Sequence, residues 1–424
     1  KEQHAGKGKQ HAAEAEAPKT PAPEPAAPAE SPWLAVIGGD IYTVTDGIIR
    51  QGTVLCRDGR IMAVGASVRV PEGARTIDAT GLRVYPGLIA VDSSGLIRGN
   101  GAGARDSFDP FSLNVDLALT GGLTTVQGSG TIVKLTRGTL DGHLLGTRPW
   151  RDLSVSPTSP SSRRQLREDL GKAREFQRKL RAWQIAKEIG KQEGEEPKPE
   201  GVDKDALALI KGEAIARFNA DTSKDLLAIC DLLEEFPLES VIFGGREAWT
   251  VAGQLGRSGA RMVLTIRDKA WADETINRAS GWTIENARIL HEHGVEFAVL
   301  PASAGISTGG ILGRDLMNLP LEAAFAVRGG LPQEVALRAL TLDAAKILGV
   351  EDRVGSIEPG KDADLIICGG DLFHYRTFVE WAVVQGRVAY DKQKAPYFAH
   401  IRPRPEASAE EVLDAVHDAV AEQM

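Results

Sequence analysis

The stretch Val84–Leu96, VYPGLIAVDSSGL, decides how the chain folds. A proline-glycine turn leads into the apolar run LIAV, which is typical of a buried strand in a parallel sheet. Two polar side chains, Asp92 and Ser94, follow the run and are spaced one residue apart. Because the run is apolar up to Val91, these two residues lie just past the carboxyl end of the predicted strand.

Short apolar runs alternate with helical stretches along the middle of the chain. Residues 223–235 and 283–292 have the spacing of amphipathic helices. The candidate strands are GLIAVD, LTTVQG, AIARFNA, ESVIFGG, ARMVLTI and VEFAVLPA. This alternation predicts an α/β fold with a parallel sheet, and specifically an eight-stranded (β/α)8 TIM-like barrel over residues 86–349.

The regions flanking the barrel have other patterns. Residues 33–85 and 350–395 contain β-branched runs broken by glycine turns, so they predict one small β-sandwich domain built from both chain ends. Residues 151–207 predict a helical insertion that is amphipathic and packs on the barrel. Residues 1–32 are rich in Ala, Pro and Glu and predict a flexible tether. Residues 396–424 predict a linker and a capped final helix.

The composition narrows the class of protein. A net charge of −8 over 424 residues argues against a nucleic-acid surface, which needs a basic excess. No apolar run reaches the length of a membrane span. Cys56, Cys230 and Cys368 are too scattered for a disulfide framework and predict buried small hydrophobes. The tether and the start at Lys1 favour a secreted protein, periplasmic or extracellular, with a cytoplasmic protein as the alternative.

The segment ALRALTLDAAKILGVEDRVGSIEPGKDADLIICGGD, residues 336–371, resembles the C-terminal signature of the amidohydrolase superfamily. VYPGLI and GGLTTVQG resemble the first two barrel strands of that family. The likeness is to the imidazolonepropionase-like amidohydrolases and extends over nearly all of residues 33–395. It implies hydrolysis of carbon–nitrogen bonds by one or two divalent metals, held by four histidines and an aspartate at the barrel mouth.

The five positions that this resemblance assigns to the metal site carry other residues here. They are Asp92 and Ser94 for the paired histidines, Asn219 and Gly244 for the third and fourth, and Ala302 for the aspartate. Zinc needs about three protein ligands plus water. We therefore expect no catalytic residue of the usual kind and no cofactor; if one is present, it should be a divalent metal.

Two substitute sites are conceivable. His291 and His293 are spaced as a metal pair, but they end a helix before its strand, on the face of a barrel that contributes stability. Alternatively, Asp92, Asn219 and Asp221 offer oxygen ligands for Mg²⁺ or Ca²⁺. Lys134 is a candidate for carbamylation, as in some members of the family.

Three functions remain open. The first is a non-catalytic subunit, a pseudoenzyme that has lost its metal site and forms a homo- or hetero-oligomer with an active amidohydrolase paralogue. The second is an active hydrolase of cyclic amides or peptide-like substrates with an altered, oxygen-ligand site. The third is a barrel that binds a ligand in its mouth without converting it.

Overall fold

The structure is a computed structural model, and it describes residues 31–97, 107–155, 158–190, 194–306 and 313–395. The described residues from Pro32 onward form one compact unit. The predicted linker and helix over 396–424 lie outside the described residues, as does the predicted tether over 1–32 apart from its last two residues.

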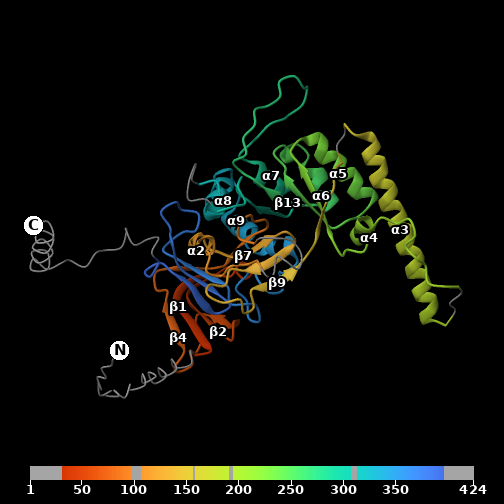
Figure 1. The fold of residues 1–424 in the computed structure, drawn as a ribbon. Helices are drawn as coiled ribbons and strands as arrows, with labels where there is room; N and C mark the ends of the chain where they lie inside the picture. Colours follow the sequence, from red (N-terminus) through yellow and green to blue (C-terminus); the bar gives the residue numbers. More distant parts are fainter. Residues whose placement is uncertain (1–30, 98–106, 156–157, 191–193, 307–312, 396–424) are drawn as a thin grey trace, which may run out of the picture. The chain divides into compact units, whose positions relative to one another are not determined.

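One eight-stranded sheet joins the two ends of the described chain (Figure 1). Its strands are β1 (Trp33–Tyr42), β2 (Ile48–Arg57), β3 (Arg60–Gly65), β4 (Arg75–Asp78), β5 (Arg83–Pro86), β15 (Leu365–Cys368), β16 (Val379–Val384) and β17 (Arg387–Asp391). The order is β17-β16-β15-β5-β1-β2-β3, with β4 paired to β1. The antiparallel pair β5–β15, with Tyr85 opposite Ile366, unites the two ends. The division of this eight-stranded sheet into the two layers of a sandwich stays a prediction.

The central strands lie in two further sheets. One contains β6 (Leu88–Ala90), β7 (Leu123–Gly128), β8 (Thr131–Lys134) and β9 (Leu144–Thr147), of which β6 and β7 are parallel. The other is wholly parallel and contains β10 (Trp150–Asp152), β11 (Ile215–Ala220), β12 (Ser240–Gly244), β13 (Arg261–Leu264) and β14 (Phe297–Val299). Each strand predicted from an apolar run is present, so the α/β class is confirmed. Closure into one eight-stranded barrel stays a prediction, because the ladders of the described residues form separate sheets.

Helices connect the parallel strands and cover them. They are α2 (Leu113–Thr120), α3 (Pro160–Glu188), α4 (Lys204–Ile210), α5 (Ser223–Glu235), α6 (Ala252–Ser258), α7 (Asn286–Glu292), α8 (Leu319–Arg328), α9 (Gln333–Leu340) and α10 (Leu342–Leu348), with short 3₁₀ turns at Ala248–Thr250 and Leu316–Asn318. α5 has the predicted bounds, since the Thr222 side chain caps it by accepting from the backbone N–H of Asp225. α7 begins three residues later than predicted. The larger hydrophobic core lies between helices and strands, around residues such as Leu88 and Phe218.

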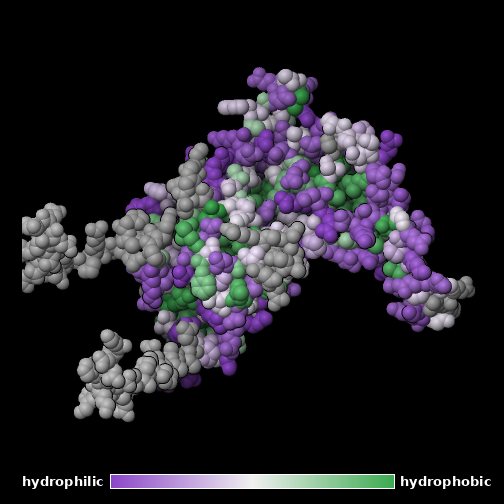
Figure 2. Space-filling model, in the orientation of Figure 1, coloured by the Kyte–Doolittle hydropathy of each residue, from purple (hydrophilic) through white to green (hydrophobic). Residues whose placement is uncertain are grey.

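The predicted insertion contains the long helix α3, which packs on the rest of the unit through its N-terminal half. Leu170, Ala173 and Phe176 are its buried residues. Farther along, Ile185 is 51% exposed and Ile189, just past the helix, is 63% exposed. Figure 2 shows a mostly hydrophilic surface along α3, interrupted by small hydrophobic areas. The amphipathic character is confirmed for the packed half, and solvent covers most of the remainder.

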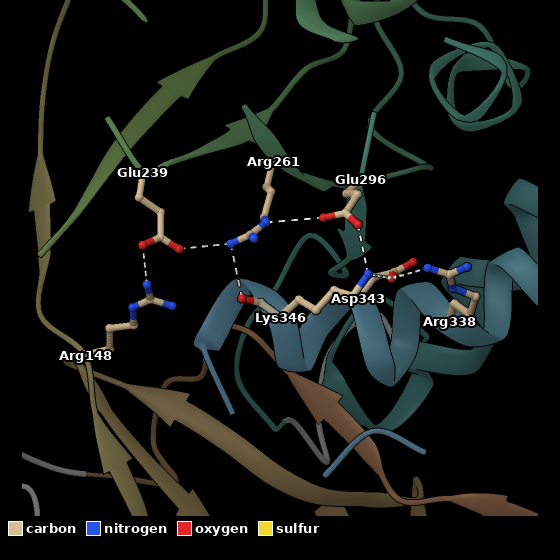
Figure 3. A network of polar contacts seen from close by, with 7 residues as sticks. All are labelled: Arg148, Glu239, Arg261, Glu296, Arg338, Asp343 and Lys346. Atoms are coloured by element: carbon tan, nitrogen blue, oxygen red, sulfur yellow. Dashed lines mark hydrogen bonds and ion pairs between the residues drawn. The ribbon is translucent and has the colours of Figure 1, made fainter. Parts of the chain in front are cut away.

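Charged residues occupy the N-terminal edge of the parallel sheet (Figure 3). Arg261, the first residue of β13, pairs with Glu239 at 3.0 Å and with Glu296 at 3.4 Å. These two glutamates directly precede β12 and β14. Lys346 of α10 pairs with Glu296 at 2.9 Å, so the network ties the helix to the strands. This edge is built for stability, which leaves the opposite edge for function.

Candidate functional site

A cavity of about 500 Å³ lies at the C-terminal ends of β11, β12, β13 and β14. Its lining includes four of the five positions that the resemblance assigns to the metal site, namely Asp92, Asn219, Gly244 and Ala302. Ser94 lies beside it, since its backbone N–H donates to the carbonyl of the lining residue Ala304 at 2.7 Å. The fold therefore brings the predicted positions together.

An arginine lies beside Asp92. Arg217, which projects from β11, pairs with Asp92 at 3.4 Å and with Asp152 at 3.6 Å. The central carbon of its guanidinium lies 4.3 Å from the ring centroid of Phe243 and 5.3 Å from that of Trp150. Aromatic faces attract a cation, and arginine keeps its charge at every relevant pH. A permanent positive charge is thus built into this part of the site.

Burial raises the pKa of the Asp92 carboxyl above its ordinary value, and the Arg217 guanidinium offsets this only in part. The side chain of Asp92 is 24% exposed. Its ionised form is therefore held in the folded protein at a cost in free energy, because the unfolded chain would leave it solvated. Such costly carboxylates are typical of functional positions.

We expect Asp92→Asn to raise the free energy of unfolding at pH 7, by roughly 0.5–1 kcal/mol. Because the pKa of Asp92 is raised, its carboxyl binds a proton more tightly in the folded parent protein than in the unfolded chain. This proton stabilises the folded parent at low pH, and the stabilisation is lost as the pH rises through the folded-state pKa of Asp92. The gain should therefore shrink as the pH falls toward about 4. Urea unfolding at both pH values measures it, and a variant no more stable than its parent at pH 7 would contradict the expectation.

The second predicted oxygen donor is also paired with an arginine. One carboxylate oxygen of Asp221 accepts a hydrogen bond from the Arg246 guanidinium at 2.9 Å, and the other accepts from the Arg246 backbone N–H at 3.3 Å. Arg246 also pairs with Asp268 at 3.0 Å. Gly244 has a φ of +101°, and a Cβ there would lie 2.5 Å from an oxygen of Asp221. A histidine at position 244 would therefore displace Asp221.

Lys134 does not reach this cavity. Its ammonium is fully buried and pairs with Asp362 at 2.5 Å and with Asp364 at 2.9 Å, in the segment that leads into β15. Two carboxylates hold the side chain as a cation, whereas carbamylation would make it an anion. The prediction that Lys134 could serve as a carbamylated ligand is therefore corrected: this lysine connects β8 to the sheet built from both chain ends.

The histidine pair lies where the sequence predicts. His291 and His293 are at the end of α7, before β14, and a ring nitrogen of His293 lies 2.9 Å from the carbonyl oxygen of Ile289. Within the ranges that the structure describes, no group of three or more His, Cys, Asp or Glu side chains is placed to hold a metal ion. The three cysteines are buried and free, and burial raises the pKa of the Cys56 thiol to about 12.

The donor set of the cavity does not fit a catalytic zinc site. Two positions, Gly244 and Ala302, have no donor side chain, and Asp92 and Asp221 each face a guanidinium. Sequence reasoning missed the arginines that matter here. The available signal was Arg217 itself, a charged residue inside the otherwise apolar strand IARF.

Comparison with known proteins relates this fold to a class of proteins. The solved structure of an amidohydrolase from Thermotoga maritima MSB8 superimposes with a TM-score of 0.61 at 23% identity, over 84% of this chain and all of that one. The chain thus has the amidohydrolase fold. The model of the amidohydrolase family matches residues 262–394, so this part of the chain is similar to that family, and the resemblance found in the sequence is confirmed.

Two curated proteins are also similar to this chain in sequence. The amidohydrolase tasK of Hapsidospora irregularis is 24% identical over 399 residues, which cover 78% of this chain and 38% of the relative. The imidazolonepropionase of Porphyromonas gingivalis is 32% identical over 171 residues, which cover 36% of this chain and 38% of the relative. The match therefore spans 38% of the length of each relative.

Among the described helices, none combines the length and the apolar character that crossing a membrane requires.

Proposed function

We propose that this chain is an amidohydrolase-fold protein that has lost metal-dependent hydrolysis and acts as a non-catalytic subunit beside an active amidohydrolase paralogue. The observation that carries the proposal is the pairing of Asp92 with Arg217 and of Asp221 with Arg246. Each guanidinium repels a divalent cation and competes for the oxygens that would bind it. In this proposal the two central sheets are parts of one (β/α)8 barrel whose mouth is the cavity.

The loss of hydrolysis is tested with the purified chain. The name of one relative suggests imidazolonepropionate as a substrate, and further cyclic amides and dipeptides represent the substrate classes predicted from the sequence. With zinc or manganese supplied, we expect no hydrolysis above the rate in buffer. Turnover that is abolished by a chelator, and also by Asp92→Ala and Asp221→Ala, would contradict the proposal and favour the active hydrolase with oxygen ligands.

The partner role is tested in the organism that makes the protein. We expect the chain to be isolated in a stoichiometric complex with a second amidohydrolase-like chain, identified by mass spectrometry and by the mass of the complex in solution. A monomer that carries a bound transition metal would contradict this role.

A ligand-binding barrel is the second candidate, and a specific observation favours it. The cavity persists at about 500 Å³, within the usual size range of small-molecule sites, and Asp92 is kept there although burial disfavours its ionised form. A ligand that raises the unfolding temperature and is recovered unchanged would support binding without turnover.

A further inference from the structure

A second cavity, of about 160 Å³, lies beside the eight-stranded sheet. Its walls come from β1, β2, β5, the start of α9 and the segment between β15 and β16. It shares no lining residue with the larger cavity. Sheet and helix residues from distant parts of the sequence therefore line a separate pocket that is open to solvent on one side.

Aromatic and apolar side chains make up much of this wall. The rings of Tyr42 and Tyr85 lie 4.5 Å apart between centroids and are tilted by 30°. Phe373 and Leu337 add further apolar surface. A cavity of about 150 Å³ accommodates one benzene ring, so this space has the right size for the six-membered ring of a ligand.

The charged groups of the wall favour a cation. Arg83 pairs with Asp371 at 3.2 Å, and its guanidinium carbon lies 5.7 Å from the ring centroid of Tyr42. Glu334, in the first turn of α9, is exposed at the mouth of the same cavity and forms no ion pair with any other residue of the described ranges. One arginine against two carboxylates leaves a net charge of −1 before a ligand binds.

The loop beside the cavity is strained at a lining residue. Val44 has a φ of +79°, a conformation that is costly for a β-branched side chain. The loop is fixed by Thr43, whose hydroxyl donates to the carbonyl of Gly47 at 2.8 Å and accepts from the backbone N–H of Asp46 at 2.8 Å. Strain of this kind recurs at ligand clamps.

We propose that this cavity binds a small arylalkylamine. Its ring packs against Tyr42, Tyr85 and Phe373, and its ammonium group pairs with Glu334 and Asp371. The proposal goes beyond the non-catalytic role, because it uses none of the residues of the larger cavity and its test measures no hydrolysis.

Calorimetric titration of the full chain with 2-phenylethylamine tests the proposal. We expect saturable one-to-one binding, which Glu334→Gln weakens by about tenfold or more, because the negative charge that pairs with the ammonium group is lost. Glu234→Gln on α5 removes the same charge outside the cavity and should leave the affinity unchanged. Unfolding temperatures of both variants verify that they are folded.

Two analogues separate the contributions of charge and ring. 3-Phenylpropanoate, which carries a negative charge, should not bind, and 2-phenylethanol should bind more weakly than the amine. The proposal is overturned if the amine does not bind, if Glu334→Gln binds it as tightly as the parent does, or if the carboxylate analogue binds equally well.

Discussion

Replacing Lys134 with methionine should lower the free energy of unfolding by about 3–5 kcal/mol, because it leaves buried charge without its partner. The lysine side chain is fully buried, and those of Asp362 and Asp364 are 4% exposed. Methionine fills a similar volume but supplies no positive charge between the two carboxylates. Chemical unfolding of parent and variant measures the loss.

Two further variants sharpen this test. Lys224→Met removes an exposed lysine of α5 and should change stability by no more than about 0.5 kcal/mol. In the Lys134→Met variant Asp362 still pairs with Arg353 at 2.7 Å, so Asp364 is the carboxylate left without a cationic partner. Adding Asp364→Asn to Lys134→Met should therefore restore part of the stability. A loss below about 1 kcal/mol for Lys134→Met would show that the buried triad contributes little.

The second large effect is expected at Gly256 in α6. A Cβ at this position would lie 2.2 Å from the backbone carbonyl oxygen of His293, which cannot move without distorting the end of α7. Gly256→Ala should lower the free energy of unfolding by about 1–3 kcal/mol despite the better helix propensity of alanine.

Gly253, in the same helix, provides the matched control. A Cβ there would meet its nearest atoms, in Arg257 and His293, at 3.6 Å, which is ordinary contact. Gly253→Ala should therefore stabilise the protein, by up to about 1 kcal/mol, through helix propensity alone. If both substitutions shift the unfolding midpoint in the same direction, the close approach at Gly256 is not the cause.

The strands were predictable because each is a short apolar run bounded by turn residues, as in GLIAVD before Ser93 and VEFAVLPA after Gly294. The assembly of these strands into sheets was not predictable, because hydrogen-bonded ladders depend on how distant segments pair. The pair β5–β15 joins residues near both ends of the described chain in one eight-stranded sheet, and the two layers of a sandwich stay a prediction.

The residues that line the site could be predicted from the sequence, but the ion pairs that they form could not. Asp92, Asn219 and Gly244 converge because the carboxyl ends of parallel strands meet at one edge. Sequence spacing does not show which carboxylate an arginine reaches, so the role of Arg217 remained hidden. Lys134 was misjudged for the same reason, since its partner Asp362 lies 228 residues away in the sequence.

Metal content after equilibrium dialysis against zinc tests the central claim most directly. Because guanidinium groups face Asp92 and Asp221 where a metal would be held, the purified chain should retain only substoichiometric zinc, and Asp92→Ala should not change that amount. One firmly held zinc per chain, released by Asp92→Ala or Asp221→Ala, would contradict the account.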